Sequence, residues 1–173
     1  MIAGPYSQAE YGPASGFDMN ELSDLLQPGA VVADLPVANK KGLFQQLGAI
    51  AERVLEVEGK LVIERLSERE RLGSTGFGGG VAIPHGKIEG LTSVKAAFVR
   101  LEKPIDFQAI DDMPVDLVFM LLSPPDAGAE HLKALAQVSR RLRDRPFVAK
   151  LRGAVTTDAL YALFASTETR DAA

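Results

Sequence analysis

The chain of 173 residues contains no cysteine and no tryptophan, and it has two histidines. Without cysteine it forms no disulfide, uses no thiol in catalysis and holds no metal through thiolates. Its 23 acidic residues outnumber its 19 lysines and arginines, which gives a net charge of −4. A general nucleic-acid binder would carry a basic domain, so this charge argues against that class of protein.

Long apolar runs are missing as well. The most apolar stretch, residues 115–122, is interrupted by Asp116 and falls far short of the ~20 residues that a membrane helix needs. Residues 1–18 have no basic start followed by an apolar stretch, so they do not have the pattern of a signal peptide. We therefore expect a cytoplasmic protein with no membrane insertion and no nucleic-acid partner.

The length and the pattern of the chain indicate one domain. Residues 1–18 mix Gly, Pro, Ser and Ala without periodicity and are predicted to be a disordered tail, while residues 167–173 are predicted to be a frayed C-terminus. Between them, residues 19–166 alternate helix-like and strand-like patterns. This predicts a single-domain α/β fold with a central mixed β-sheet flanked by helices on both faces.

The periodicity of apolar residues predicts the individual elements. In chain order these are a helical turn at 22–26 closed by Pro28 and Gly29, a strand at 30–35, a helix from a capping Asn39 to Gly59, a helix at 61–72, strands at 94–101 and 115–122, and helices at 129–144, 146–152 and from Thr156 or Thr157. The helix at 129–144 is expected to turn Leu132, Leu135, Val138 and Leu142 to the core and Arg140, Arg141 and Arg143 to water.

The most unusual stretch is residues 67–87, SERERLGSTGFGGGVAIPHGK. Five of the eight residues from Gly73 to Gly80 are glycine, and ordering them is costly because glycine loses the most backbone freedom on folding. Such a loop needs positive φ angles or a close approach of its backbone. It leads into a short apolar run and then into His85, held between proline and glycine. We interpret the stretch as a reaction centre.

Several glycine-loop chemistries can be eliminated. A P-loop would need Lys and Ser or Thr where Gly79 and Gly80 stand, and the dinucleotide fingerprint would need a third glycine where Val81 stands. The GxSxG nucleophile elbow is absent from the chain. What remains is a glycine-rich anion cradle beside His85, with Arg69 and Arg71 upstream. This pattern suits phosphoryl transfer through a neutral imidazole, with an arginine fork on the phosphoryl oxygens.

Three segments carry a family resemblance: RERLGSTGFGGGVAIPHGK, PIDFQAIDDMPVDLVFMLL and HLKALAQVSRRL. They resemble the type-2 enzyme IIA domains of the bacterial phosphotransferase system, especially those of the nitrogen-regulatory branch. The resemblance runs over about residues 22–164 and implies the same α/β architecture. It implies that His85 is the phosphorylated residue and that Arg69 and His131 flank the phosphoryl group. We assign the phosphoryl-cradle loop to Gly73, Ser74, Thr75, Gly76 and Gly78.

Plainer structural roles are open for two of these residues. Arg69 and Arg71 fall in the last turn of a helix, where a cation is favourable without any catalytic role, and only the resemblance separates them. His131 falls in the first turn of the helix at 129–144, where backbone N–H groups favour an anion. A lone helical histidine is otherwise more often structural.

The resemblance implies a phosphoryl carrier and regulator. It would accept a phosphoryl group from HPr or a nitrogen-branch HPr homologue and signal through its phosphorylation state, with potassium transport proteins or sensor kinases as targets. The alternative within the family is the IIA component of a fructose- or mannitol-type uptake system, which passes the group to a IIB domain. No cofactor or metal is expected.

Two other classes compete with this interpretation. A metal-dependent hydrolase using His85, His131 and Glu89 is disfavoured, because the chain has no HExxH motif or Asp-rich cluster. A pure binding module, with the glycine loop as a surface turn, overlaps with the regulatory role.

Phe77 is the only large apolar side chain between Gly73 and Gly80. It is predicted to be the docking anchor for the protein donor, because one aromatic near the centre of a small interface can carry much of the affinity. The alternative is that Phe77 packs into the core and pins the loop.

Overall fold

Two apolar strands form the centre of the sheet in the structure, a computed structural model that describes residues 22–166. Strand β5 (Lys95–Ile105) and strand β6 (Val115–Ser123) pair antiparallel, with Phe98 opposite Phe119. Seven of the nine β6 residues are fully covered apolar residues, which confirms that this run is a strand buried on both faces.

The remaining strands make the sheet mixed, as predicted. Strand β1 (Leu26–Leu35) pairs parallel to β5 and forms one edge. Strands β3 (Val81–Ala82) and β4 (His85–Lys87) both pair parallel to β6, and β2 (Gly76–Gly78) pairs antiparallel to β3 at the other edge. The order along the sheet is β1-β5-β6-β3-β2.

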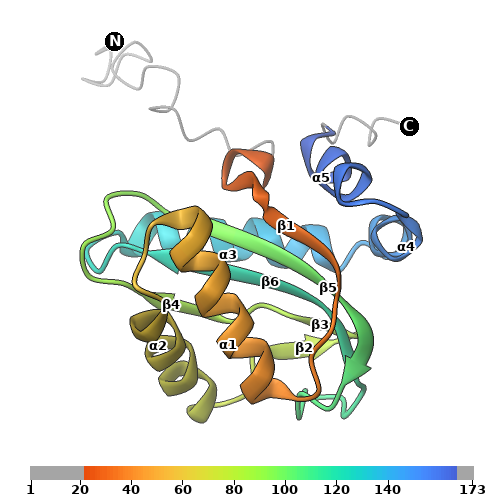
Figure 1. Cartoon of the computed structure of the whole chain (residues 1–173), viewed down its shortest axis with the longest axis horizontal. Helices are drawn as coiled ribbons and strands as arrows, with labels where there is room; N and C mark the ends of the chain where they lie inside the picture. Colours follow the sequence, from red (N-terminus) through yellow and green to blue (C-terminus); the bar gives the residue numbers. More distant parts are fainter. Residues whose placement is uncertain (1–21, 167–173) are drawn as a thin grey trace, which may run out of the picture.

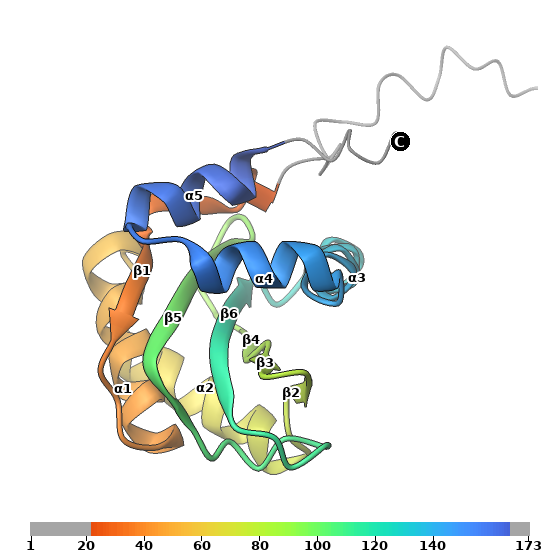
Figure 2. The same ribbon diagram turned by 90° about the vertical axis from the view of Figure 1, so that its right-hand side faces the viewer.

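Helices cover both faces of this sheet (Figures 1 and 2). Helices α1 (Lys40–Ile50) and α2 (Gly59–Arg71) lie on one face, and a π-helical turn at Ala51–Leu55 extends α1. Helices α3 (Gly128–Leu142), α4 (Arg145–Gly153) and α5 (Thr157–Ala165) lie on the other side, and a 3-10 turn at Leu22–Asp24 precedes β1. The predicted α/β fold with helices on both faces is confirmed.

The two faces bury separate apolar layers, because successive strand residues point to opposite sides. Along β6, Val118 and Met120 pack with α1 and α2, whereas Phe119 and Leu121 pack with α3, α4 and α5. The second layer includes Phe164 from α5, whose ring lies 4.8 Å from that of Phe98.

The first strand begins earlier than predicted. Pro28 and Gly29 do not close a helical turn but lie inside β1, where the pairing with β5 shifts register between Leu26 and Val31. An edge strand tolerates proline, and a bulge absorbs the residues that cannot continue the ladder. Pro28 and Gly29, which predicted a turn, therefore form a bulge in β1.

Gly59 was also expected to end the helix that begins at Asn39, and this is wrong. The Asn39 carboxamide does cap α1, accepting from the Gly42 amide at 2.8 Å, but the helical segment ends at Glu56, which has φ of 57°. Gly59 begins α2 instead. A Cβ on Gly59 would lie 2.7 Å from the Gly48 carbonyl oxygen, so the glycine permits the close crossing of α1 and α2.

On α3 the predicted core face is partly wrong. Leu132 is 67% exposed, whereas His131 is buried together with Ala134, Val138 and Leu142. The arginines of this helix are also not simply solvated. The Arg141 guanidinium lies 3.9 Å from the centre of the Phe147 ring.

The predicted tail at 1–18 and the predicted frayed end at 167–173 lie outside the described residues. Within residues 22–166, no helix combines the length and the apolar character needed to cross a membrane.

Candidate functional site

His85 lies at the carboxyl end of strand β6, where the chain passes from β3 through Pro84 into β4. It pairs with Leu121 of β6, and the Leu121 amide donates to the Pro84 carbonyl at 3.0 Å. Both flanking strands are fixed to the most buried strand of the sheet. The position of the half-buried imidazole is therefore set by a rigid element.

One hydrogen bond determines which nitrogen of His85 is available. Its Nδ1 lies 2.8 Å from the Ile83 carbonyl oxygen. A carbonyl can only accept, so Nδ1 carries the proton and Nε2 keeps its lone pair. Burial holds the pKa of His85 below its ordinary value, and the charge of Arg69 also lowers it. The hydrogen bond to Ile83 raises this pKa but does not outweigh the burial. The ring is neutral at cellular pH, with a free lone pair on Nε2.

His131 lies beside this ring although it is 46 positions later in the chain. The two ring centroids are 5.4 Å apart, with the planes inclined by 51°. His131 is 7% exposed, and its Nδ1 lies 2.5 Å from the Ser123 hydroxyl oxygen at the end of β6. Burial, with the charges of His85 and Lys87, lowers the pKa of His131 to about 4. With Nδ1 engaged, Nε2 is the nitrogen left for a neighbouring group.

The structure shows the helix-end position of Arg69, and its role beside the phosphoryl group stays a prediction. As predicted it lies in the last turn of α2, where its Nη1 donates to the Gly73 carbonyl at 2.8 Å. Its charge also acts on the His85 ring. The exposed Arg71, two positions later, has no such contact with the loop among the described residues.

The glycine stretch is a β-hairpin rather than an open loop. Ser74, Thr75 and Gly76 lie at its base, where the Thr75 carbonyl accepts from the Ile83 amide at 3.0 Å. A Cβ on Gly76 would lie 2.8 Å from that of Ala109, so this glycine permits close packing. The base of the hairpin therefore runs beside the segment that carries His85.

The Glu70 carboxylate holds this base in place. It accepts from the Thr75 amide at 3.1 Å and from the Thr75 hydroxyl at 2.5 Å, and it pairs with Lys40 at 3.0 Å. Burial raises the pKa of Glu70, but these hydrogen bonds outweigh it and hold the pKa below its ordinary value. Glu70 links the helix of Arg69 to the loop.

The tip of the hairpin lies at the opposite end of β6. Gly78, Gly79 and Gly80 have φ angles of 113°, 68° and 82°, which glycine alone adopts readily. The Gly80 carbonyl accepts from the Leu117 amide, four residues before the partner of His85, or roughly 13 Å along the strand. The structure thus brings Gly73, Ser74, Thr75 and Gly76 towards the end of the sheet that bears His85, but not Gly78.

Phe77 is half-buried and packs against the second apolar layer, beneath the Arg143 guanidinium at 5.2 Å. Arg143 follows α3 at the far end from His131, roughly 18 Å along the helix. Phe77 therefore belongs to a different end of the domain from the two histidines, and its role in docking the donor stays a prediction.

Three residues of the site were missed by sequence reasoning. Lys87 could have been found, because it is two residues from His85 on a strand and shares its side. Glu70 and Ser123 gave no signal, since an acidic residue on a helix and a serine at a strand end have many roles. Only their distances to Thr75 and His131 distinguish them.

The described residues contain no group of three or more histidine, aspartate or glutamate side chains that could hold a metal ion. Glu89, the carboxylate considered for a metal site, lies 3.7 Å from the Arg65 guanidinium and is exposed.

The chain is similar to known proteins of one family. Residues 24–167 match the family described as phosphoenolpyruvate-dependent sugar phosphotransferase system, EIIA 2. A nitrogen regulatory protein of Bradyrhizobium diazoefficiens is 46% identical over 144 residues, covering 83% of this chain and 94% of that protein.

Two solved structures are similar. The nitrogen regulatory protein IIA-Ntr of Neisseria meningitidis has a TM-score of 0.78 at 36% identity and covers 82% of this chain and 97% of its own. Enzyme IIA-Mtl, solved in complex with phosphorylated enzyme IIB-Mtl of Escherichia coli, shares the fold with a TM-score of 0.68 at 20% identity, over 82% and 99% of the two chains. The chain therefore belongs to the enzyme IIA type-2 family of the phosphoenolpyruvate-dependent sugar phosphotransferase system.

Proposed function

We propose that this protein is a phosphoryl carrier and regulator of the nitrogen branch of the phosphotransferase system, phosphorylated on Nε2 of His85. The observation that carries the proposal is the 2.8 Å hydrogen bond from Nδ1 to the Ile83 carbonyl. It fixes the tautomer in which Nε2 has a lone pair, on a half-buried ring beside a second imidazole and an arginine.

The transfer step needs no proton. The Nε2 lone pair attacks the phosphorus of a phosphohistidine on the donor protein, and a new N–P bond forms. The donor's N–P bond breaks, and its electron pair returns to the donor's imidazole. His85 keeps its Nδ1 proton on the Ile83 carbonyl throughout, so the ring remains in place when the group arrives.

Arg69 and His131 support this step from two sides. The Arg69 guanidinium supplies positive charge near the ring and can donate to phosphoryl oxygens while Nη1 holds Gly73. His131 is neutral at cellular pH because its pKa is about 4, and the Ser123 hydroxyl fixes its ring. A neutral Nε2–H donates a hydrogen bond to a phosphoryl oxygen without transferring the proton.

The proposed partners are those that the family resemblance implies. The donor is HPr or its nitrogen-branch homologue in the cytoplasm, and the regulatory targets, potassium transport proteins or sensor kinases, distinguish the phosphorylated from the free form. Relatives named nitrogen regulatory protein favour this branch.

Incubation with the phosphorylated donor tests the proposal. The wild-type chain should gain one phosphoryl group that is labile in acid and stable in alkali, and His85→Ala should gain none. Phosphorylation of His85→Ala by the same donor would overturn the assignment.

A role in sugar uptake is the second candidate, favoured by the shared fold with an enzyme IIA that was solved together with its IIB partner. Adding a fructose- or mannitol-type IIB domain to the phosphorylated chain separates the two roles. Rapid loss of the label to IIB supports transport, whereas a stable label supports regulation.

A further inference from the structure

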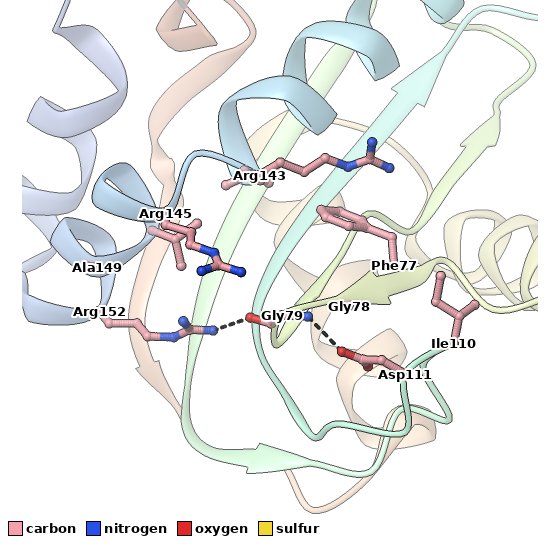
Figure 3. Close-up of a pocket in the computed structure, with 11 residues that line it drawn as sticks. Phe77, Gly78, Gly79, Ile110, Asp111, Arg143, Arg145, Ala149 and Arg152 are labelled. Atoms are coloured by element: carbon pink, nitrogen blue, oxygen red, sulfur yellow. Dashed lines mark hydrogen bonds between the residues drawn. The ribbon is translucent and has the colours of Figure 1, made fainter.

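A groove lies at the end of the domain opposite to the histidines (Figure 3). It encloses about 910 Å³ between the hairpin tip, the loop around Ile110, the end of α3 and one side of α4. This volume is within the range of small-molecule sites, about 300–1,000 Å³. Its wall begins at Leu142, about 17 Å along α3 from His131, so the groove is separate from the proposed phosphorylation site.

Helix α4 turns one face to the groove. Arg145, Val148, Ala149 and Arg152 line it, which is the spacing of one helix face. The two arginines are roughly 10 Å apart along the helix, with apolar side chains between them. A ligand on this face meets a cation at each end and an apolar surface in the middle.

The positive charge of this groove is largely uncompensated at one end. Arg152 is paired with Asp116 at 2.8 Å and donates to the Gly79 carbonyl. Arg143 and Arg145 form no ion pair with a carboxylate within residues 22–166. Figure 3 shows the Arg145 guanidinium directed into the open space and the Arg143 guanidinium above Phe77.

The acidic side chain that lines the groove, Asp111, is already engaged by backbone amides. The Asp111 carboxylate accepts from the amides of Gly79 and Met113, at 2.9 and 3.0 Å. In Figure 3 the side chains of Asp111 and Arg145 lie on opposite sides of Gly79. On a chain with a net charge of −4, two arginines that pair with no carboxylate within residues 22–166 give this wall a local positive charge, which attracts a dianion. Their planar forks match the geometry of phosphate oxygens.

The rest of the wall is apolar. Phe77, Leu142 and Val148 line it with Ile110, which is 72% exposed. A large exposed apolar side chain beside an aromatic ring is suited to contact with a flat, weakly polar group. Inorganic phosphate alone would leave this surface uncovered.

We propose that this groove is a second ligand site, which binds a phosphorylated small molecule carrying an aromatic ring, of the nucleoside monophosphate class. The phosphate contacts Arg143 and Arg145, and the ring lies against Phe77, Ile110 and Val148. The hairpin tip is held on both sides of the site, by Arg152 at the Gly79 carbonyl and by Asp111 at the Gly79 amide. A ligand therefore binds to a preformed wall.

Calorimetric titration of the full chain with AMP tests the proposal. Wild-type protein should bind one AMP with a saturable isotherm, more tightly than adenosine or inorganic phosphate. The double variant Arg143→Gln/Arg145→Gln should bind at least tenfold more weakly. Arg140→Gln is the matched control, because Arg140 is exposed on the same helix outside the groove, and its affinity should equal that of the wild type.

Each other outcome overturns the proposal. Absence of saturable binding removes the site, and an equal loss in Arg140→Gln means general attraction of anions. If inorganic phosphate binds as tightly as AMP, the aromatic ring makes no contact that adds affinity. If a hexaglutamate peptide binds more tightly than AMP, the groove is a site for an acidic protein segment. Because His85→Ala should bind AMP like the wild type, and the double variant should still accept phosphoryl groups, this inference and the proposed function fail independently.

Discussion

At the scale of single residues, Arg69 is the side chain whose two roles most need to be separated. We expect Arg69→Ala to slow phosphoryl transfer, because it removes positive charge beside His85, and every 1.4 kcal/mol of lost stabilisation slows the step about tenfold. Arg71→Ala is the control, since Arg71 is exposed in the same helical turn. Single-turnover rates from the phosphorylated donor measure the effect. Equal rates in both variants would leave Arg69 as a helix cap only.

His131 requires a different substitution. Alanine would leave the buried Ser123 hydroxyl without its partner, so it would disturb folding as well as transfer. Glutamine keeps a polar group for the Ser123 hydroxyl. His131→Gln should transfer more slowly than the wild type while its melting temperature stays close to it. A normal rate would exclude His131 from the transfer step.

His131 also predicts how stability depends on pH. Its pKa is about 4 in the folded chain and about 6.5 when unfolded, so the unfolded state binds the proton more readily. Stability is therefore complete above the unfolded value and falls as pH drops from about 6.5 to 4, by up to about 3 kcal/mol from this group. Urea unfolding at pH 7 and 4.5 should show a smaller loss for His131→Gln than for the wild type. Equal losses would contradict the assignment.

At the scale of elements, the crossing of α1 and α2 positions Arg69 and Glu70 at the end of α2. The crossing depends on Gly48, where a Cβ would lie 2.8 Å from both the Gly59 carbonyl oxygen and Ile63. Gly48→Ala should lower stability by about 1–3 kcal/mol, since overpacking outweighs the better helix propensity of alanine.

Gly42→Ala in the same helix is the control for this prediction. Its Cβ would meet nothing closer than the Asn39 oxygen at 3.4 Å, so alanine should stabilise by about 0.5–1 kcal/mol. Chemical denaturation of both variants gives the comparison. If both substitutions stabilise the protein, α1 and α2 can move apart without any loss of stability, which would contradict the prediction.

At the scale of the whole molecule, Arg100 connects the sheet to the last two helices. It is 7% exposed on β5 and donates to the carbonyls of Leu151 and Ala154 at the end of α4, as well as to Asp34 on β1. Arg100→Met keeps the bulk of the stem but leaves the two carbonyls without their donor. We expect a loss of about 3 kcal/mol, at roughly 1–3 kcal/mol for each buried unpaired group.

The ion pair between Arg100 and Asp34 should contribute much less to stability than the hydrogen bonds from Arg100 to the two carbonyls. The Asp34 side chain is 63% exposed, and asparagine tolerates its φ of 54°. Asp34→Asn should cost less than about 1 kcal/mol, as exposed pairs do. Unfolding in urea ranks the two variants, and equal losses would show that the charge pair, not the carbonyls, carries the effect.

The sequence by itself determined most of the elements and indicated His85 as the candidate site residue. The apolar runs of β5 and β6, the Asn39 cap and the early position of His131 in a helix all follow from local periodicity and capping, which act between near neighbours. The glycines and His85 identified the centre of interest and its family. Local signals failed at Pro28 and Gly59, because a turn residue also serves a bulge or a close helix crossing.

Only the tertiary structure decided which parts meet. It brought the His131 ring centroid to 5.4 Å from that of His85 and joined Glu70 to Thr75 by hydrogen bonds. It also placed the base of the hairpin and its tip at opposite ends of β6. It also gathered Phe77, Arg143 and Arg145 into a groove at the other end. Periodicity tells which side of an element is buried, but the partner of that side depends on packing between segments far apart in the chain. That packing lowered the pKa of Glu70, His85 and His131.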